Sequence, residues 1–339
     1  MQSRRVKKVL LVLLLFFIFF LLFSYWYMMK CEENWKGEPL EKQMKAEMGE
    51  IKKGMESDIE YLQNLGPRNS ENETNYNQLR QCEEWIRQRW ESQGYVVKKH
   101  TLSIREKEYS NLEIEIKGRT LPSQIIIISA QYDTLPDSPG ANNNGSGIAI
   151  LFQLSHLLRK HHPERTLRLL NFVNEEDPFF GTEMMGSFQY AKRCRQQGED
   201  IRVMLSLDAL GVYKDEPGSQ RLPFPFSLFY PDRGNFLAFI GNLQSRKYVK
   251  EVSKGFKKGS SFQIQAGVAP EWAKGAAWSD HSSFWKFGYP GIMVTDTGGF
   301  RSVYHTTKGD TMEKLNFEAM SRIVIGMYTS AVHLTSLQE

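Results

Sequence analysis

Three short apolar segments of the sequence are each followed by acidic side chains. The acids are Asp133, the adjacent pair Glu175 and Glu176, and Asp208, and a later loop adds His305. Carboxylates and imidazoles are the side chains that bind zinc and similar cations. Of two adjacent glutamates, one can bind a metal while the other takes a proton from a metal-bound water. These residue types indicate a hydrolytic metal site, provided that the fold brings them together.

The segments that carry these acids predict an α/β fold. Residues 124–130, 167–173 and 203–207 are continuous apolar runs, which are typical of strands buried on both faces. Helices are expected at residues 147–160 and 182–195 between them. This alternation favours a mixed, mostly parallel sheet between helices. Because parallel strands end at one edge of such a sheet, we expect the acids on a common rim.

Further elements are expected on both sides of this unit. Apolar side chains recur every three or four positions over residues 41–65, which predicts an amphipathic helix within a stalk or lid at 30–65. The main domain is then expected at 66–339. Its other expected elements are a helix at 74–92, strands at 95–102, 112–116 and 291–295, and a helix at 316–337.

An uncharged apolar segment at residues 9–29 predicts a transmembrane helix. About 20 apolar residues cross the ~30 Å of bilayer hydrocarbon, and flanking Lys and Arg stay on the cytoplasmic side. Residues 1–8 contain four basic residues and no acid. A cleaved signal peptide is the alternative, but the run is too long and lacks a small-residue cleavage site. We expect a single-pass anchor with a cytoplasmic N-terminus and an extracytoplasmic main domain.

Charge and cysteine content exclude other classes. The net charge of +4 comes entirely from residues 1–8, because 43 Lys and Arg face 39 Asp and Glu over the whole chain. The neutral remainder lacks the basic surface of a nucleic-acid-binding protein. The three cysteines are too few for a disulfide framework or a thiol metal site. One arrangement pairs Cys82 with Cys194 and leaves Cys31 at the membrane surface.

The motifs around the acids resemble those of the secreted dizinc aminopeptidases, whose fold is shared by glutaminyl cyclases and by the transferrin receptor ectodomain. The resemblance covers roughly residues 64–337. It implies an eight-stranded mixed sheet, two zinc ions, and substrates that are peptide or protein N-termini. The motifs are Ser129-Ala130-Gln131-Tyr132-Asp133, Pro139 through Gly147, Phe172-Val173-Asn174-Glu175-Glu176, Leu205-Ser206-Leu207-Asp208, Trp278-Ser279-Asp280-His281 and Tyr304-His305 with Asp310-Thr311.

This resemblance also implies a role for each acid. Glu175 matches the general base of the family, which activates the attacking water. Glu176, Asp208 and His305 match zinc ligands. Asp133 matches the residue that orients a ligand histidine through a hydrogen bond. The implied chemistry is removal of an N-terminal residue by hydrolysis.

Two of the five implied ligand positions depart from the family pattern. Gln131 stands where the family has His, and Asn143 stands where it has an Asp that bridges both metals. Two dications about 3.5 Å apart repel by on the order of 19 kcal/mol at an effective dielectric constant of ~20, and a bridging carboxylate offsets much of this. A neutral amide does not. We expect one weakly held zinc ion or none.

The two amides have a second consequence. Without metal, the carboxylates crowd like charges, and amide NH2 groups at Gln131 and Asn143 can donate hydrogen bonds to them. The main hypothesis is therefore an impaired or inactive aminopeptidase-like domain that binds peptides or a partner. The alternative is an active aminopeptidase with a single or altered metal site and Glu175 as base. A glutaminyl cyclase is a remote alternative, because it needs an Asp at position 143.

Aromatic residues near the motifs have two interpretations. The segment 221–230 contains four of them, and Phe284, Trp285 and Phe287 follow Asp280-His281. They either line an apolar pocket for a substrate side chain or pack beneath a long loop. The roles of Asp280 and His281 are left open, as are the oligomeric state and the peptide preference.

Overall fold

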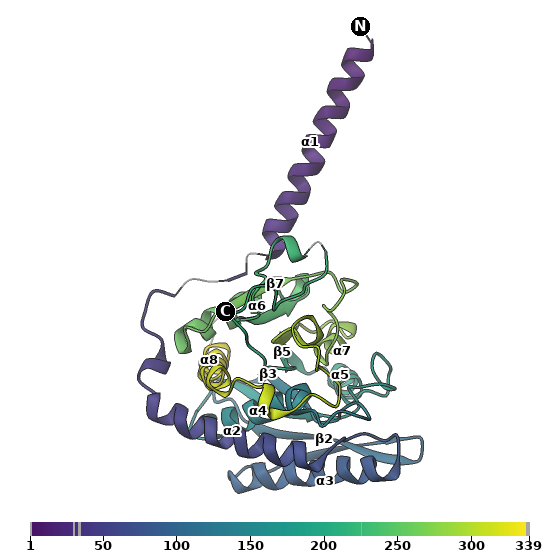
Figure 1. The fold of residues 1–339 in the computed structure, drawn as a ribbon. Helices are drawn as coiled ribbons and strands as arrows, with labels where there is room; N and C mark the ends of the chain where they lie inside the picture. Colours follow the sequence, from purple (N-terminus) through teal and green to yellow (C-terminus); the bar gives the residue numbers. More distant parts are fainter. Residues whose placement is uncertain (1, 30, 33–34, 225, 337–339) are drawn as a thin grey trace.

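An eight-stranded sheet with helices on both faces forms the body of the molecule (Figure 1). The computed structural model describes residues 2–29, 31–32, 35–224 and 226–336. The strand order is β1-β2-β4-β3-β5-β8-β6-β7. The strands are β1 Lys98–Ile104, β2 Lys107–Ile116, β3 Leu121–Gln131, β4 Arg165–Phe172, β5 Asp200–Leu207, β6 Leu237–Gly241, β7 Ile264–Val268 and β8 Gly291–Thr295.

The four central strands β4, β3, β5 and β8 run parallel to one another. The edge strands are mixed: β1, β2 and β4 pair antiparallel, and β6 and β7 pair parallel to each other but antiparallel to β8. The apolar runs predicted from the sequence form the central strands, because both faces of these strands are covered by helices. The predicted α/β class and the mixed, mostly parallel sheet are confirmed.

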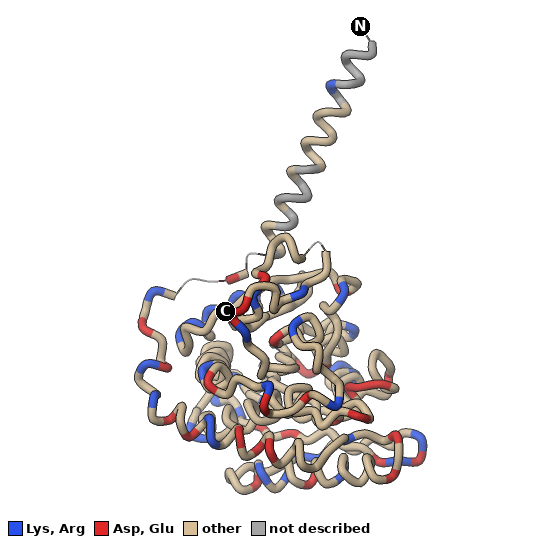
Figure 2. Tube along the Cα trace, in the orientation of Figure 1, with Lys and Arg blue, Asp and Glu red and all other residues tan. Residues whose placement is uncertain are grey.

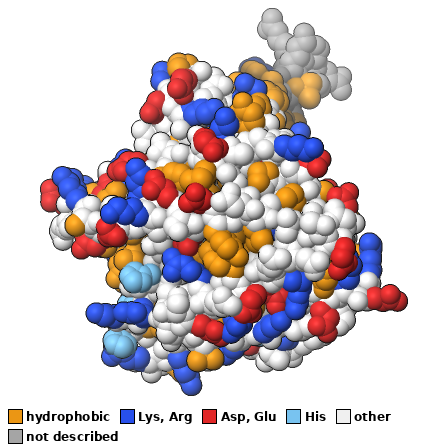
Figure 3. All heavy atoms as spheres, turned by 60° about the horizontal axis from the view of Figure 1, so that its bottom comes forward, with side chains coloured by type: hydrophobic (Ala, Val, Ile, Leu, Met, Phe, Trp, Pro, Cys, Tyr) orange, Lys and Arg blue, Asp and Glu red, His pale blue; other side chains and the backbone are white. Residues whose placement is uncertain are grey.

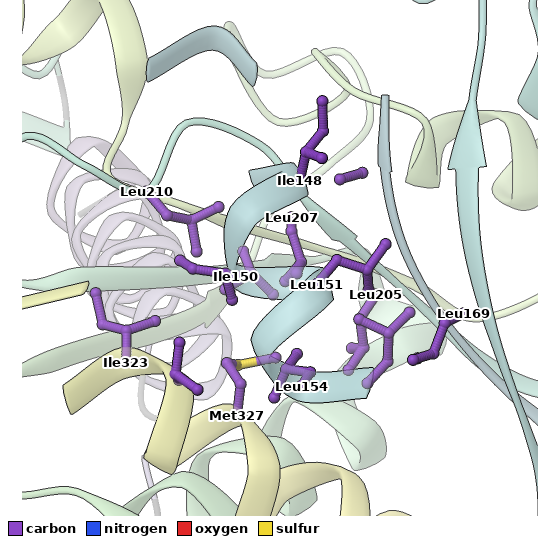
Figure 4. Packing of buried hydrophobic residues seen from close by; sticks show 14 of the residues in the cluster. Ile148, Ile150, Leu151, Leu154, Leu169, Leu205, Leu207, Leu210, Ile323 and Met327 are labelled. Atoms are coloured by element: carbon purple, nitrogen blue, oxygen red, sulfur yellow. The ribbon is translucent and has the colours of Figure 1, made fainter. Parts of the chain in front are cut away.

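Two helical layers cover the sheet. One contains α2 (Lys45–Leu65), α4 (Gly147–Leu158), α6 (Arg246–Gly259) and α8 (Phe317–Thr335), which contact one another. The other contains α5 (Gly186–Gln196) and α7 (His281–Lys286), while α3 (Glu73–Ser92) packs on β2. Figure 4 shows α4 in the first layer, with its apolar side chains between the sheet and α8.

The helix expected as a stalk or lid is a packed layer of the domain. It begins at Lys45, after a short 3-10 turn at Leu40–Lys42 in which Glu41 accepts hydrogen bonds from Ser260 and Ser261. The apolar spacing that predicted this helix places one stripe of it against α4 and α8, so it cannot stand free. The fully or nearly buried members of the stripe are Ile51, Met55, Ile59 and Leu62.

The N-terminal helix α1 (Gln2–Met29) projects from the body beside β7 (Figures 1 and 2). Its apolar side chains at residues 10–17 are 54–68% exposed. Just after it, the Cys31 N–H donates to the Ala266 carbonyl of β7 at 3.3 Å. Within the ranges that the structure describes, no helix reaches the length and hydropathy of a membrane crossing. The anchor at residues 9–29 stays a prediction.

The disulfide considered from the sequence is absent. Cys82 and Cys194 are both free and buried, and they pack in two different apolar clusters, one with α3 and one with α5. Cys31 is also buried. Sequence counting left this pairing open because it carries no information on which helices share a cluster.

Candidate functional site

The acids predicted to share a rim do lie at one edge of the sheet, where the parallel strands β3, β4 and β5 end. Asp133, two residues after β3, ties two of these loops together. Its carboxylate oxygens accept hydrogen bonds from the backbone N–H groups of Glu175 and Glu176 at 3.1 and 3.0 Å. Asp133 therefore positions Glu175 and Glu176 through their backbone N–H groups.

A chain of amide hydrogen bonds starts from Asn144, whose orientation is fixed by the backbone. Its Oδ1 accepts from the Ala209 N–H at 3.1 Å, and its Nδ2 donates to the Leu207 carbonyl at 2.7 Å. Because a backbone N–H only donates and a carbonyl only accepts, the two ends of the Asn144 amide cannot exchange. The same Nδ2 donates to Gln131 Oε1 at 2.5 Å, which turns the Gln131 NH2 group the other way.

That orientation points amide donors at the two glutamates. Gln131 Nε2 lies 3.3 Å from Asn143 Oδ1 and 3.4 Å from Glu175 Oε2. With its oxygen engaged, Asn143 donates through Nδ2 to Glu176 Oε1 at 2.5 Å. Both residues at the substituted ligand positions thus present N–H groups to carboxylates. This agrees with the prediction that the Gln131 and Asn143 amides donate hydrogen bonds to the acids.

The carboxylates are buried and crowd one another. Burial, together with the charges of Asp208 and Glu176, raises the pKa of Glu175 well above its ordinary value. Burial and the charges of Asp133 and Asp208 likewise raise the pKa of Glu176, although the hydrogen bond from Asn143 opposes this. Burial raises the pKa of Asp208 to about 6, against hydrogen bonds from Ser279 and Gln131. Protonated forms are therefore favoured in this cluster.

His305 lies at the far side of the same site. It lines a cavity with Asp208, and burial lowers the pKa of its imidazole. Its Nδ1 has no hydrogen-bond partner within the described part of the chain. No hydrogen bond links it to the amides or glutamates there, so the structure brings His305 to the site without joining it to their network.

Two residues that the sequence did not assign hold the loop of Asn143. The Asp310 carboxylate accepts from the backbone N–H groups of Asn142 and Asn143 at 2.8 and 2.9 Å. The buried Arg68 guanidinium donates to backbone carbonyls that include those of Tyr132 and Pro139. Asp310 lay in a family motif, but Arg68 carried no signal, because its partners are carbonyls far along the chain.

The Asp280-His281 pair is buried behind the site. Burial raises the pKa of Asp280 well above its ordinary value, and the charges of Asp133 and Asp208 add to this. His281 hydrogen-bonds the Ala276 carbonyl through Nε2 at 2.8 Å, and burial lowers its pKa to about 4. His281 thus has a structural role, because it holds the loop that contains Ala276.

The cavity beside Asp208 and His305 has a volume of about 170 Å³. The segment 221–230 contributes to it, which supports the pocket interpretation for that segment. Phe284 and Trp285 do not: both are buried in the core, since α7 packs on β5 and β8. The apolar lining includes Leu222, Phe226, Phe236, Ile240, Met293 and Phe300.

No three His, Cys, Asp or Glu side chains within the described ranges are arranged as a metal-binding group. The residues that would contribute are Glu176, Asp208 and His305. Glu176 is hydrogen-bonded to Asn143, and Asp208 to Ser279 and Gln131. Glu176 and Asp208 are therefore engaged by the protein, whereas His305 Nδ1 has no hydrogen-bond partner within the described ranges.

Comparisons with known proteins agree on one family. The model of "Peptidase family M28" matches residues 111–329. The uncharacterized protein YfbL of Escherichia coli is 32% identical over 285 residues, which are 81% of this chain and 86% of YfbL. Among solved structures, the LapA aminopeptidase of Legionella pneumophila gives a TM-score of 0.64 at 17% identity, covering 91% of this chain and 78% of LapA. The glutaminyl cyclase of Porphyromonas gingivalis gives 0.60 at 16%, covering 83% and 97%.

Proposed function

The chain belongs to peptidase family M28, and on that premise we propose that it is a peptide-binding aminopeptidase-like domain whose hydrolytic activity is lost or strongly reduced. The observation that carries this proposal is the pair of amide–carboxylate hydrogen bonds, from Gln131 to Glu175 and from Asn143 to Glu176. These hydrogen bonds engage Glu175 and Glu176, whose counterparts in a zinc peptidase bind the metal and activate the water.

Zinc is the metal of this family, and the residues present do not fit a pair of zinc ions. Zinc ligands must offer lone pairs. At both substituted positions the amide oxygen accepts a hydrogen bond, and the NH2 group faces the cleft. The backbone of Leu207 and Ala209 fixes this arrangement through Asn144, so rotating one amide alone would leave several hydrogen bonds unmade.

The cavity supports a peptide as the ligand. A dry, apolar cavity of about 150 Å³ accommodates a benzene-sized group, and this cavity has about 170 Å³. An apolar N-terminal side chain such as Leu or Phe fits this volume. Asp208, which lines the cavity, offers a carboxylate acceptor for a peptide α-amino group.

The test is the double variant Gln131→His with Asn143→Asp. Losing even the outer hydrogen-bond partner of a ligand costs 10–100-fold in metal affinity, so restoring two ligands should raise zinc affinity by more than about 100-fold. Zinc retained after dialysis is measured by atomic absorption, and leucine p-nitroanilide hydrolysis is followed in parallel. The single variants, each with one restored ligand, are the matched controls.

Natural protein that retains two equivalents of zinc and hydrolyses the anilide would overturn the proposal. Zinc uptake in the double variant that disappears when Glu176→Gln is added would show that the restored site uses the expected ligand. A peptide such as Leu-Gly-Gly should bind the natural protein without being cleaved, as measured by calorimetry with and without a chelator.

An active aminopeptidase with one metal ion is the second candidate. It is favoured by the retention of Glu175 as base and of Glu176, Asp208 and His305 as ligands. It predicts anilide hydrolysis by the natural protein that a chelator abolishes and that Glu175→Ala abolishes. A glutaminyl cyclase is a remote candidate, and cyclisation of an N-terminal glutamine peptide tests it.

We also propose that residues 9–29 hold the chain in a membrane, with residues 1–8 cytoplasmic. The support is the uncharged apolar sequence and the exposed apolar side chains of α1. Exposing these apolar side chains to water is unfavourable, and placing them in bilayer hydrocarbon removes that cost. Resistance of the chain to alkaline carbonate extraction from membranes is expected, and release into the soluble fraction would contradict it.

A further inference from the structure

A patch of exposed apolar and basic side chains lies where β6 and β7 end. The two parallel strands lead into neighbouring loops, which are joined by a 3.1 Å hydrogen bond from Asn242 Nδ2 to Glu271 Oε1. The loop at 222–228 packs on the second of them through Phe226, which contacts a small cluster of alanines. We call this surface the α1-side patch, and it consists of Phe224, Leu228, Leu243, Arg246, Lys247, Trp272 and Lys274.

The apolar members are unusually exposed for their size. Trp272 is 87% exposed, Phe224 80%, Leu228 66% and Leu243 59%. Isolated exposed apolar residues are common, but several on adjoining loops mark an interaction surface. Aromatic side chains with a charged fringe are the composition of proteins that sit in the headgroup region of a membrane.

Basic side chains surround these apolar groups. Lys247 is the second residue of α6 and is exposed, and Lys274 is exposed in the same turn as Trp272. Glu271, the residue before Trp272, accepts the hydrogen bond from Asn242. Helix α6 continues the positive charge, because six Lys or Arg and one Glu occupy its 14 residues. At 100° per residue, the six basic positions fall within an arc of about 120°.

The foot of α1 adjoins this patch. Arg246 donates to the Tyr27 carbonyl at 3.0 Å, and its guanidinium lies 3.8 Å from the centre of the Tyr27 ring. Figure 1 shows α1 leaving the body at this end, with α3 at the opposite end. On the face turned forward in Figure 3, acidic and basic side chains are interspersed. A membrane that contained α1 would meet the α1-side patch first.

We propose that the α1-side patch rests on the membrane surface and binds anionic phospholipid headgroups. Trp272, Phe224, Leu228 and Leu243 enter the interface, and the basic side chains pair with lipid phosphates. This inference rests on the proposed membrane location and deepens it, because it fixes how the domain faces the bilayer. The 221–230 segment then contributes both to the lipid contact and to the peptide cavity, so peptides held near the membrane gain access first.

The experiment uses the full chain reconstituted in lipid nanodiscs. The three native cysteines are buried, so Leu243→Cys provides a single exposed site for a nitroxide label. The matched control is Val96→Cys, which is 84% exposed in the connection from α3 to β1. Collisions with a polar nickel chelate and with oxygen report the depth of each label. In discs containing phosphatidylglycerol, we expect the label at 243 to be about tenfold less accessible to the chelate than the label at 96.

Equal chelate accessibility of the two labels in these discs would overturn the proposal. If the label at 243 lies equally deep in discs of phosphatidylcholine alone, the proposed binding of anionic headgroups is wrong. The charge-reversed variant Lys247→Glu with Lys274→Glu should return the label at 243 to water. The control reversal, Lys52→Glu with Lys53→Glu on α2, should leave it in place, and the same response to both reversals would contradict a specific patch.

Carbonate extraction separates failure of the anchor from failure of the patch. If the chain is released, the anchor is wrong, and the released chain is mixed with phosphatidylglycerol vesicles and sedimented. The patch alone then predicts salt-sensitive binding that weakens about 30-fold or more when Lys247 and Lys274 are reversed. Vesicle binding that ignores this reversal would overturn the patch as well.

Discussion

Two groups of buried carboxylates in this molecule differ in what surrounds them. Glu113 on β2 is 2% exposed and accepts hydrogen bonds from His100 at 2.9 Å and Tyr190 at 2.8 Å, with Arg168 close by. Burial acts to raise the pKa of Glu113, but the His100 hydrogen bond and the Arg168 charge lower it to about 2.

The carboxylates of the candidate site have amides where Glu113 has cations. Gln131 and Asn143 supply hydrogen bonds but no charge, and burial raises the pKa values of Glu175, Glu176 and Asp208. Glu113 is therefore ionised and stabilises the fold, whereas the site carboxylates are held at a cost in stability. A cluster of buried carboxylates with raised pKa values, and with no cation beside it in the described part of the chain, marks a place kept for function rather than for folding.

The largest expected effect is at Glu113. The variant Glu113→Gln leaves Arg168 and Lys98 without their buried partner and should lower the free energy of unfolding by about 3 kcal/mol. Urea denaturation followed by circular dichroism measures it. The control Glu108→Gln changes an exposed glutamate on the same strand and should have little effect. If Glu113→Gln lowers the free energy of unfolding no more than Glu108→Gln does, Glu113 does not stabilise the fold as stated.

The site should destabilise the fold as pH rises. Asp208 has a folded pKa of about 6 against an ordinary value of 3.8, so the folded state binds more protons between these values. Stability from this group is full below pH 3.8 and is lost as pH rises through 6. Asp208→Asn should remove a decline on the order of 2 kcal/mol between pH 4 and pH 7.

Urea denaturation at a series of pH values measures this difference. Glu113→Gln is the opposite control, because its depressed pKa gives stability that is lost as pH falls from 4.5 toward 2. Parallel pH profiles for the natural protein and Asp208→Asn would contradict the raised pKa.

The smallest expected effect has the opposite sign to the first. Glu175→Gln keeps an oxygen to accept the hydrogen bond from Gln131 but removes one charge from the crowded cluster. Stability at pH 8 should rise by about 1 kcal/mol, because one repulsive buried carboxylate is gone. The gain should shrink at pH 5, where the cluster is protonated. Destabilisation at pH 8 would show that Glu175 is compensated by a cation, as Glu113 is.

Much of the fold follows from local patterns. The continuous apolar runs predicted β3, β4 and β5, and the three- and four-residue spacing predicted α2. Helices were also predicted at the positions of α3, α4, α5 and α8. The short strands β6 and β7 were not predicted, nor was α6 between them, because five-residue segments after a long excursion give little periodicity. The sequence predicted α2 within a stalk or lid but not that its apolar stripe packs on α4 and α8, which are distant in sequence.

The candidate site divides in the same way. The rim of acids followed from strand ends, and the substitutions at Gln131 and Asn143 were visible as departures from a family pattern. Asn144, Asp310 and Arg68 were not assigned, since each acts through hydrogen bonds to residues far along the chain. Such contacts leave no periodic trace in a sequence.

The sequence by itself determined which groups the site contains: four acids and a histidine, with amides where the family has an imidazole and a carboxylate. Only the tertiary structure decided what those amides do. An amide has an acceptor end and a donor end of nearly equal size, and its neighbours select which end faces the cleft. Here the backbone after β5 orients Asn144, Asn144 orients Gln131, and the donors end on Glu175 and Glu176.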